Sequence, residues 1–139
     1  MLAVARANCQ GRPEICFVEA DAGALPFAAA SFDIVLCQGT FHHFAPALAV
    51  AFLAEARRVC RGAIFVTDLR RSPLLYAGAW LLLNLVVSNR ITRHDGLSSI
   101  RRAYLPGEML ELAREAGLTG AKMKTTLRFR QSLSWELEG

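Results

Sequence analysis

Short apolar runs separated by amphipathic stretches predict an α/β protein. Residues 15–20, 32–37 and 63–68 each contain four consecutive apolar side chains, and polar residues or glycine follow each run. Continuous apolar runs of this length are typical of strands that are buried in a parallel sheet. We therefore expect three parallel strands.

The segment between the second and third runs has helical spacing. Residues 46–59 are amphipathic, with one apolar stripe, so strand, helix and strand follow one another as in a βαβ unit. Residues 1–8 also have helical spacing, but no capping residue precedes them. This start resembles the later part of a helix.

Helix boundary signals mark two helices in the second half of the chain. Ser72 can cap a helix over residues 74–87, with Pro73 at its first position. A second helix is predicted over residues 106–116, where Gly117 occupies the C-cap position.

The remaining segments have weaker patterns. Residues 89–104 are polar and weakly periodic, which predicts a loop or a broken helix. Residues 118–136 contain two alternating stretches, which predict two strands. Since repeats, low-complexity segments and linkers are absent from the sequence, a single α/β domain over residues 1–139 is expected.

The composition agrees with one folded domain and argues against nucleic acid as a specific partner. The 139 residues are 53% hydrophobic, which is enough for a core and argues against disorder. The net charge is +4, but the basic residues are 14 arginines and 2 lysines scattered as singles and pairs. Without a basic run, we expect no specific nucleic-acid binding.

The four cysteines and the N-terminus favour a reducing compartment. The cysteines lack CxxC spacing, so neither a metal site nor a disulfide framework is expected. The N-terminus lacks the continuous apolar region of a secretory signal. We therefore expect a cytoplasmic protein.

The longest apolar stretch, residues 74–87, is short for a membrane helix. It would extend about 21 Å, against a hydrocarbon core of about 30 Å. It also contains Asn84 and is flanked by arginines. A buried or lid helix is the expectation; a protein that uses this stretch at a membrane surface is the alternative.

Several motifs at strand ends resemble those of class I S-adenosylmethionine-dependent methyltransferases, in particular the small-molecule, type 11-like branch. The pattern consists of an acid, then LPF, SFD, an apolar strand and a pair of histidines. Matching segments cover nearly the whole chain: Asp21, LPF at 25–27, SFD at 31–33, FHHF at 41–44, the helix and strand at 55–68, and PGEMLELAREAGL at 106–118.

The resemblance implies S-adenosyl-L-methionine as the cofactor and names three binding residues. The Asp21 carboxylate would accept from the adenine amino group, and the Ala22 N–H would donate to a ring nitrogen. The Gln38 carbonyl would contact the methionine part. The alternatives are that Asp21 only stabilises a tight turn and that Gln38 only satisfies the end of its strand.

The resemblance also implies a small-molecule methyl acceptor, apolar or phenolic, beside His42 and His43. An imidazole with a pKa of about 6.5 can accept a hydroxyl proton at neutral pH. One of the two histidines is therefore expected to act as a base or to orient the acceptor; the alternative is a structural histidine. The family's variable insertion corresponds to residues 72–105, which are expected to shape the acceptor pocket, with Asp68 and the pair at 94–95 as weaker candidates.

Two features of the family pattern have no counterpart. The sequence contains neither the glycine-rich loop with its acid-x-Gly-x-Gly pattern nor the second-strand acid that holds the ribose. Met1 matches an interior position of the family. We therefore expect a Rossmann-like, doubly wound sheet that lacks its first two strands. The chain would then be the C-terminal part of a truncated enzyme.

This expectation has consequences for the chain by itself. It should neither bind the cofactor measurably nor transfer methyl groups, and it should self-associate through unpaired strand edges. The alternative function is a non-catalytic remnant or binding module that keeps the back half of the fold but cannot hold the cofactor.

Overall fold

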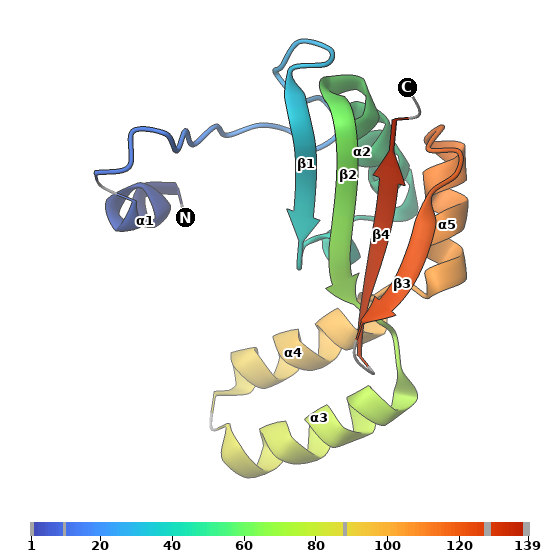
Figure 1. Cartoon of the computed structure of the whole chain (residues 1–139). Coiled ribbons are helices and arrows are strands. Elements are labelled where there is room, and N and C mark those ends of the chain that lie inside the picture. Colours follow the sequence, from blue (N-terminus) through green and yellow to red (C-terminus); the bar gives the residue numbers. More distant parts are fainter. Residues whose placement is uncertain (1, 10, 88, 127–128, 138–139) are drawn as a thin grey trace.

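A computed structural model describes residues 2–9, 11–87, 89–126 and 129–137. The described strands form one mixed sheet in the order β1-β2-β4-β3 (Figure 1). Strands β1 and β2 are parallel, whereas β4 is antiparallel to both of its neighbours. Their bounds are β1 Phe32–Gln38, β2 Cys60–Leu69, β3 Lys122–Thr126 and β4 Arg130–Glu136.

Two helices, α2 (Pro46–Val59) and α5 (Pro106–Glu115), cover one face of this sheet (Figure 1). The core lies between them and alternate residues of the strands. Its fully buried side chains include Leu53 of α2, Ile64 of β2, Met109 of α5 and Leu133 of β4. The βαβ unit predicted from the sequence is confirmed, because β1, α2 and β2 follow one another with β1 and β2 parallel.

The other face of the sheet is not covered by any helix in the described ranges. On β1, Ile34 and Leu36 are 57% and 72% exposed on this side. The second helical layer of a doubly wound sheet is therefore not among the described residues, although the α/β architecture is confirmed.

The strand expected at residues 15–20 is not formed. This segment runs as an extended connection between α1 (Leu2–Asn8) and the sheet, and Val18 is half exposed (Figure 1). A strand is held by the hydrogen bonds of a neighbouring strand. The described chain offers residues 15–20 no such neighbour, so the apolar run remains unpaired, and so does the outer edge of β1.

The predicted helix signals at Ser72 and Gly117 are confirmed. The Ser72 hydroxyl accepts a hydrogen bond from the Leu75 N–H at 3.3 Å at the start of α3 (Pro73–Val86). Gly117 follows α5 with a φ of 82°, a left-handed conformation that favours glycine. The two strands predicted in the tail are β3 and β4, and their connection at residues 127–128 lies outside the described residues.

One expectation for the segment between β2 and α5 was wrong, and a second was wrong in part. Residues 89–104, expected as a loop or a broken helix, contain the continuous helix α4 (Arg90–Arg102), whose start is capped by the Asn89 side chain. Helix α3 was expected to be buried or to form a lid; none of its residues is buried, and its role as a lid stays a prediction. It packs against α4, and together they project from the end of the sheet (Figure 1).

Candidate active site

The site is built where the parallel strands β1 and β2 end. Because both strands run in the same direction, their carboxyl ends meet at one edge of the sheet, where ligands bind in open α/β folds. Gln38 ends β1, and Asp68 lies near the end of β2. A short 3-10 turn, η1 (Phe41–His43), follows β1 and carries both histidines.

His42 and Asp68 form a buried pair. Asp68 is 2% exposed and His42 is 7% exposed. One carboxylate oxygen lies 2.8 Å from Nδ1 of His42, and the other accepts the backbone N–H of His42 at 2.7 Å. The Leu69 N–H also donates to this carboxylate, at 2.6 Å. These contacts fix the position of the carboxylate and the orientation of the imidazole ring.

The pairing determines which nitrogen of His42 can accept a proton. An ionised carboxylate can only accept hydrogen bonds, so Nδ1 carries the proton in this pair. In the neutral ring, Nε2 is then the basic nitrogen. It is buried, and no group among the described residues forms a hydrogen bond with it. In this pair, Nε2 of His42 is therefore available to accept a proton.

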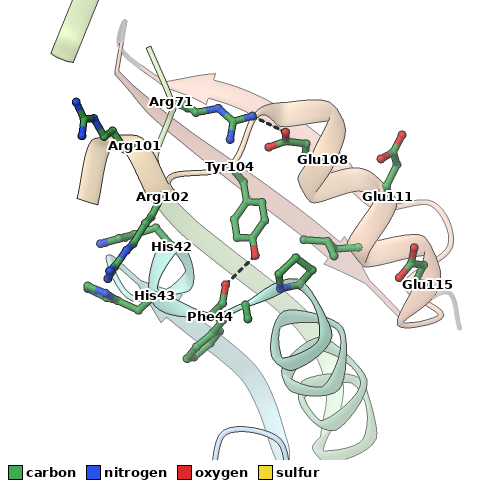
Figure 2. A pocket seen from close by; sticks show the side chains of 13 residues that line it. His42, His43, Phe44, Arg71, Arg101, Arg102, Tyr104, Glu108, Glu111 and Glu115 are labelled. Carbon is green, nitrogen blue, oxygen red and sulfur yellow. Dashed lines mark hydrogen bonds and ion pairs between the residues drawn. The ribbon is translucent and has the colours of Figure 1, made fainter. Parts of the chain in front are cut away.

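His43 is the exposed member of the two neighbouring histidines. Its ring centroid lies 4.0 Å from that of His42, and both side chains line the same cavity (Figure 2). His43 is thus exposed to solvent, whereas His42 is buried and hydrogen-bonded to Asp68.

The cavity has a volume of about 620 Å³ and lies between η1, α4 and α5 (Figure 2). The Tyr104 side chain lines this cavity, and its hydroxyl donates a hydrogen bond to the Phe44 carbonyl at 2.7 Å. Burial, and then the nearby Glu108 carboxylate, raise the pKa of Tyr104, so the phenol stays protonated. The lining residues are His42, His43, Phe44, Ala45, Pro46, Arg71, Arg101, Arg102, Tyr104, Glu108, Glu111, Leu112 and Glu115.

Charges are distributed unevenly around the cavity. Arg101 and Arg102 come from the end of α4, on the side of the two histidines, whereas Glu111 and Glu115 of α5 lie on the opposite side (Figure 2). Arg71 pairs with Glu108 between these two groups. The side nearest the imidazoles is therefore cationic.

The residues expected to bind the adenine lie on a separate loop. Asp21 accepts the Gly23 N–H at 2.9 Å, which is the tight turn that the alternative interpretation described. Its side chain is exposed, and Ala22 is half-buried. Neither residue lines the cavity of His42 and His43, and neither does Gln38.

The loop that follows Asp21 is attached to α2 by hydrogen bonds to Glu55 and Arg58, which form an ion pair within that helix. Glu55 accepts the Leu25 N–H at 2.8 Å and pairs with Arg58, which donates to the Phe27 carbonyl at 2.8 Å. The hydrogen bond from Arg58 and then that from Leu25 lower the pKa of Glu55 to about 2. The carboxylate therefore stays ionised, and the loop stays attached, throughout the neutral range.

Sequence analysis underestimated Asp68 and missed most of the cavity wall. Asp68 was a weaker candidate because an acid at a strand end does not by itself reveal its partner. Arg101, Arg102 and Tyr104 belong to residues 72–105, which were expected to shape the acceptor pocket, but no pattern singled out these three side chains within a segment expected to be a loop or a broken helix. The exposed pair His94 and Asp95, 3.7 Å apart on α4, does not line the cavity.

A second buried polar group supports the site from β4. Gln131 is fully buried, and its side-chain amide donates to the Tyr104 carbonyl at 2.7 Å and to the Leu69 carbonyl at 3.2 Å. These bonds tie the segment that carries Tyr104 to the end of β2. The position of Tyr104 in the cavity therefore depends on the sheet as well as on α4.

Other chemistry at this edge of the sheet is limited. Burial, and then the charge of Asp68, raise the pKa of the Cys37 thiol to about 11, so Cys37 is not a nucleophile at neutral pH. In the described ranges, no three His, Cys, Asp or Glu side chains gather to hold a metal ion. None of the described helices is long and apolar enough to cross a membrane.

Comparisons with known proteins agree with this architecture. A family model for a methyltransferase domain matches residues 1–66. No curated protein sequence matches the chain. The PH0226 protein from Pyrococcus horikoshii OT3 is 16% identical, with a TM-score of 0.73, over 99% of this chain and 69% of that one.

Two solved methyltransferases have the same fold. A SAM-dependent methyltransferase from Aquifex aeolicus is 13% identical, with a TM-score of 0.64, over 98% of this chain and 62% of that one. Human N-acetylserotonin methyltransferase, in complex with SAM, is 16% identical, with a TM-score of 0.63, over 96% of this chain and 37% of that one.

The fold is that of α/β methyltransferases of known structure, with the candidate site at the ends of the parallel strands. The family model covers slightly less than half of the chain, and the fold is that of solved S-adenosylmethionine-dependent methyltransferases, which agrees with the resemblance seen in the sequence. The chain spans 37–69% of the length of the three solved structures.

Proposed function

We propose that this chain provides the acceptor-binding and proton-accepting side of an S-adenosylmethionine-dependent methyltransferase that acts on a small hydroxyl acceptor, apolar or phenolic. The observation that carries the proposal is the buried pair of His42 and Asp68 on the wall of the cavity. A pair of this kind supplies a base of fixed orientation, which a hydroxyl acceptor needs and a purely binding module does not.

The residues proposed to hold the cofactor have suitable chemistry. Asp21 is exposed, and Gly23 occupies only its Oδ1 in the described structure, so the other oxygen can accept from an amine. The adjacent Ala22 N–H can donate to a ring nitrogen. The Gln38 carbonyl accepts only the Thr40 hydroxyl, at 3.3 Å, and retains acceptor capacity. When bound, S-adenosylmethionine supplies an electrophilic methyl group.

Methyl transfer requires in-line placement and the removal of one proton. We propose that the acceptor hydroxyl donates its proton to Nε2 of His42 while its oxygen bonds to the methyl carbon. Asp68, already hydrogen-bonded to Nδ1–H, stabilises the imidazolium that forms. His43 covers His42, so its movement would admit the acceptor to Nε2.

The cavity wall supports an acceptor with an aromatic or apolar body. Tyr104 and Phe44 provide apolar surface, and their rings pack with Phe41 at centroid distances of 5.5 and 5.9 Å. Arg102 lies on the side of the histidines, where a developing phenolate would be (Figure 2). These groups favour phenols over aliphatic alcohols, because a phenolate is the more accessible anion.

The proposal is tested by comparing acceptors that need a base with acceptors that do not. Methyl transfer would be measured on a simple phenol and on a nitrophenol that is already ionised at neutral pH. His42→Gln is expected to lower kcat on the simple phenol by about 10²- to 10⁴-fold and to change it little on the nitrophenol.

The matched control is His94→Gln, which alters an exposed histidine outside the cavity. It should leave both rates unchanged. If His42→Gln lowered kcat equally on both acceptors, His42 would have a structural role, and its proposed role as a base would be wrong. Absence of methyl transfer from S-adenosylmethionine to either acceptor would reject the proposed activity.

A further inference from the structure

Among the described elements, α3 has the most large apolar side chains that are exposed. Leu74, Trp80, Leu81, Leu82, Leu85 and Val86 are all more than half exposed, and Leu85 reaches 75%. Soluble surfaces rarely keep this many large apolar side chains together without a partner.

Helix α3 keeps this surface exposed because α4 covers only one of its sides. Tyr76 and Leu83, which lie against Arg101 and Gly96 of α4, are half-buried, whereas most other large side chains of α3 are exposed. Arg101 fixes the pair by donating to the Tyr76 hydroxyl at 2.7 Å, with its guanidinium 4.7 Å from the ring centroid. The apolar surface therefore lies on a braced helical hairpin.

The same hairpin is strongly basic. Residues 70–102 contain six arginines and a single acid, Asp95, which gives a formal charge of +5 with His94 neutral. The whole chain carries +4, so its positive charge is concentrated here. The arginines stand at the two ends of the hairpin helices, at positions 70, 71, 90, 93, 101 and 102.

We propose that the α3–α4 hairpin docks on an anionic lipid surface. A short apolar helix with exposed leucines and a tryptophan, flanked by arginines, is suited to lie within the interface between headgroups and acyl chains. The arginines of the hairpin that do not line the cavity, at positions 70, 90 and 93, would face acidic headgroups, whose negative potential attracts basic segments. With 14 residues, α3 extends about 21 Å and lies in the interface without spanning it.

Charge favours a lipid surface over a second copy of the chain. Two hairpins that met through α3 would bring charges of +5 close together, and like charges across an interface oppose association. An anionic surface instead complements the arginines while it buries the leucines.

The proposal is tested by flotation of the 139-residue chain with vesicles. We expect binding to equimolar phosphatidylcholine and phosphatidylglycerol, at least about tenfold weaker binding to phosphatidylcholine alone, and release when the salt is raised from about 0.1 M to about 1 M. Trp80 is half exposed and Trp135 is buried, so a blue shift of fluorescence on binding should disappear in Trp80→Phe.

Paired substitutions locate the contact. Leu81→Ser with Leu85→Ser should weaken binding to the mixed vesicles at least about tenfold, because it removes apolar side chains from the surface of α3. Leu36→Ser is the matched control, since Leu36 is as exposed but lies on the uncovered face of the sheet.

Three results would overturn the proposal. The first is equal binding to both vesicle types. The second is weaker vesicle binding for Leu36→Ser but unchanged binding for the double variant Leu81→Ser, Leu85→Ser. The third is a dimer that forms without lipid and that this double variant disrupts. The last result would assign the surface to a second copy of the chain.

Discussion

Asp68→Asn is expected to lower kcat for methyl transfer to a simple phenol by about 10²- to 10⁴-fold while KM changes little. The carboxylate accepts the Nδ1 proton of His42 and would stabilise the imidazolium. An asparagine amide is neutral and can also donate, so it favours the wrong tautomer of the ring. The measurement is a comparison of kcat and KM between the Asp68→Asn variant and the unmodified protein.

A structural effect of Asp68→Asn can be separated from a loss of chemistry. Asp95→Asn is the matched control, because Asp95 lies beside His94 but both are exposed and outside the cavity. The ionised nitrophenol acceptor should retain most of its rate with Asp68→Asn. If folded Asp68→Asn lost the same factor in rate on both acceptors, Asp68 would have a structural role and would not assist His42 as a base.

Leu133→Ala is expected to lower the free energy of unfolding by about 2–5 kcal/mol, the usual cost of a large-to-small change in a core. Leu133 is fully buried on β4, a central strand, and stands opposite Val66 of β2 and Met123 of β3. A domain of this size is stable by about 5–15 kcal/mol, so the change removes a large share of that stability. Urea unfolding followed by circular dichroism measures it.

Leu36→Ala is the matched control for this core substitution. Leu36 is also a leucine on a strand, but it is 72% exposed on the face that no described helix covers. Its replacement should change stability by no more than about 0.5 kcal/mol. If Leu36→Ala were as destabilising as Leu133→Ala, the uncovered face of the sheet would be buried in solution.

The sequence predicted the elements that depend on local signals. Ser72 and Gly117 marked helix ends because a side-chain cap and a left-handed backbone each have a recognisable residue type. The apolar runs at 32–37 and 63–68 became β1 and β2. The run at 15–20 had the same composition but no pairing partner in the described chain, and composition alone could not reveal this.

The candidate site was less accessible to sequence analysis because it depends on contacts distant in the chain. His42 could be proposed from its position after a strand, but its partner Asp68 is 26 residues away and was identified by a hydrogen bond. Arg102 reached the cavity only because residues 90–102 form a continuous helix. The contacts of Asp21, Ala22 and Gln38 with the cofactor remain predictions.

The protonation of the His42 ring tests the central claim most directly, since base catalysis requires a free Nε2. Nitrogen chemical shifts of the imidazoles, measured by NMR on the labelled chain above the pKa of the ring, report which nitrogen carries the proton. We expect His42 to carry its proton on Nδ1, and Asp68→Asn to abolish this preference. A proton on Nε2 of His42 in the unmodified chain would contradict the proposed role.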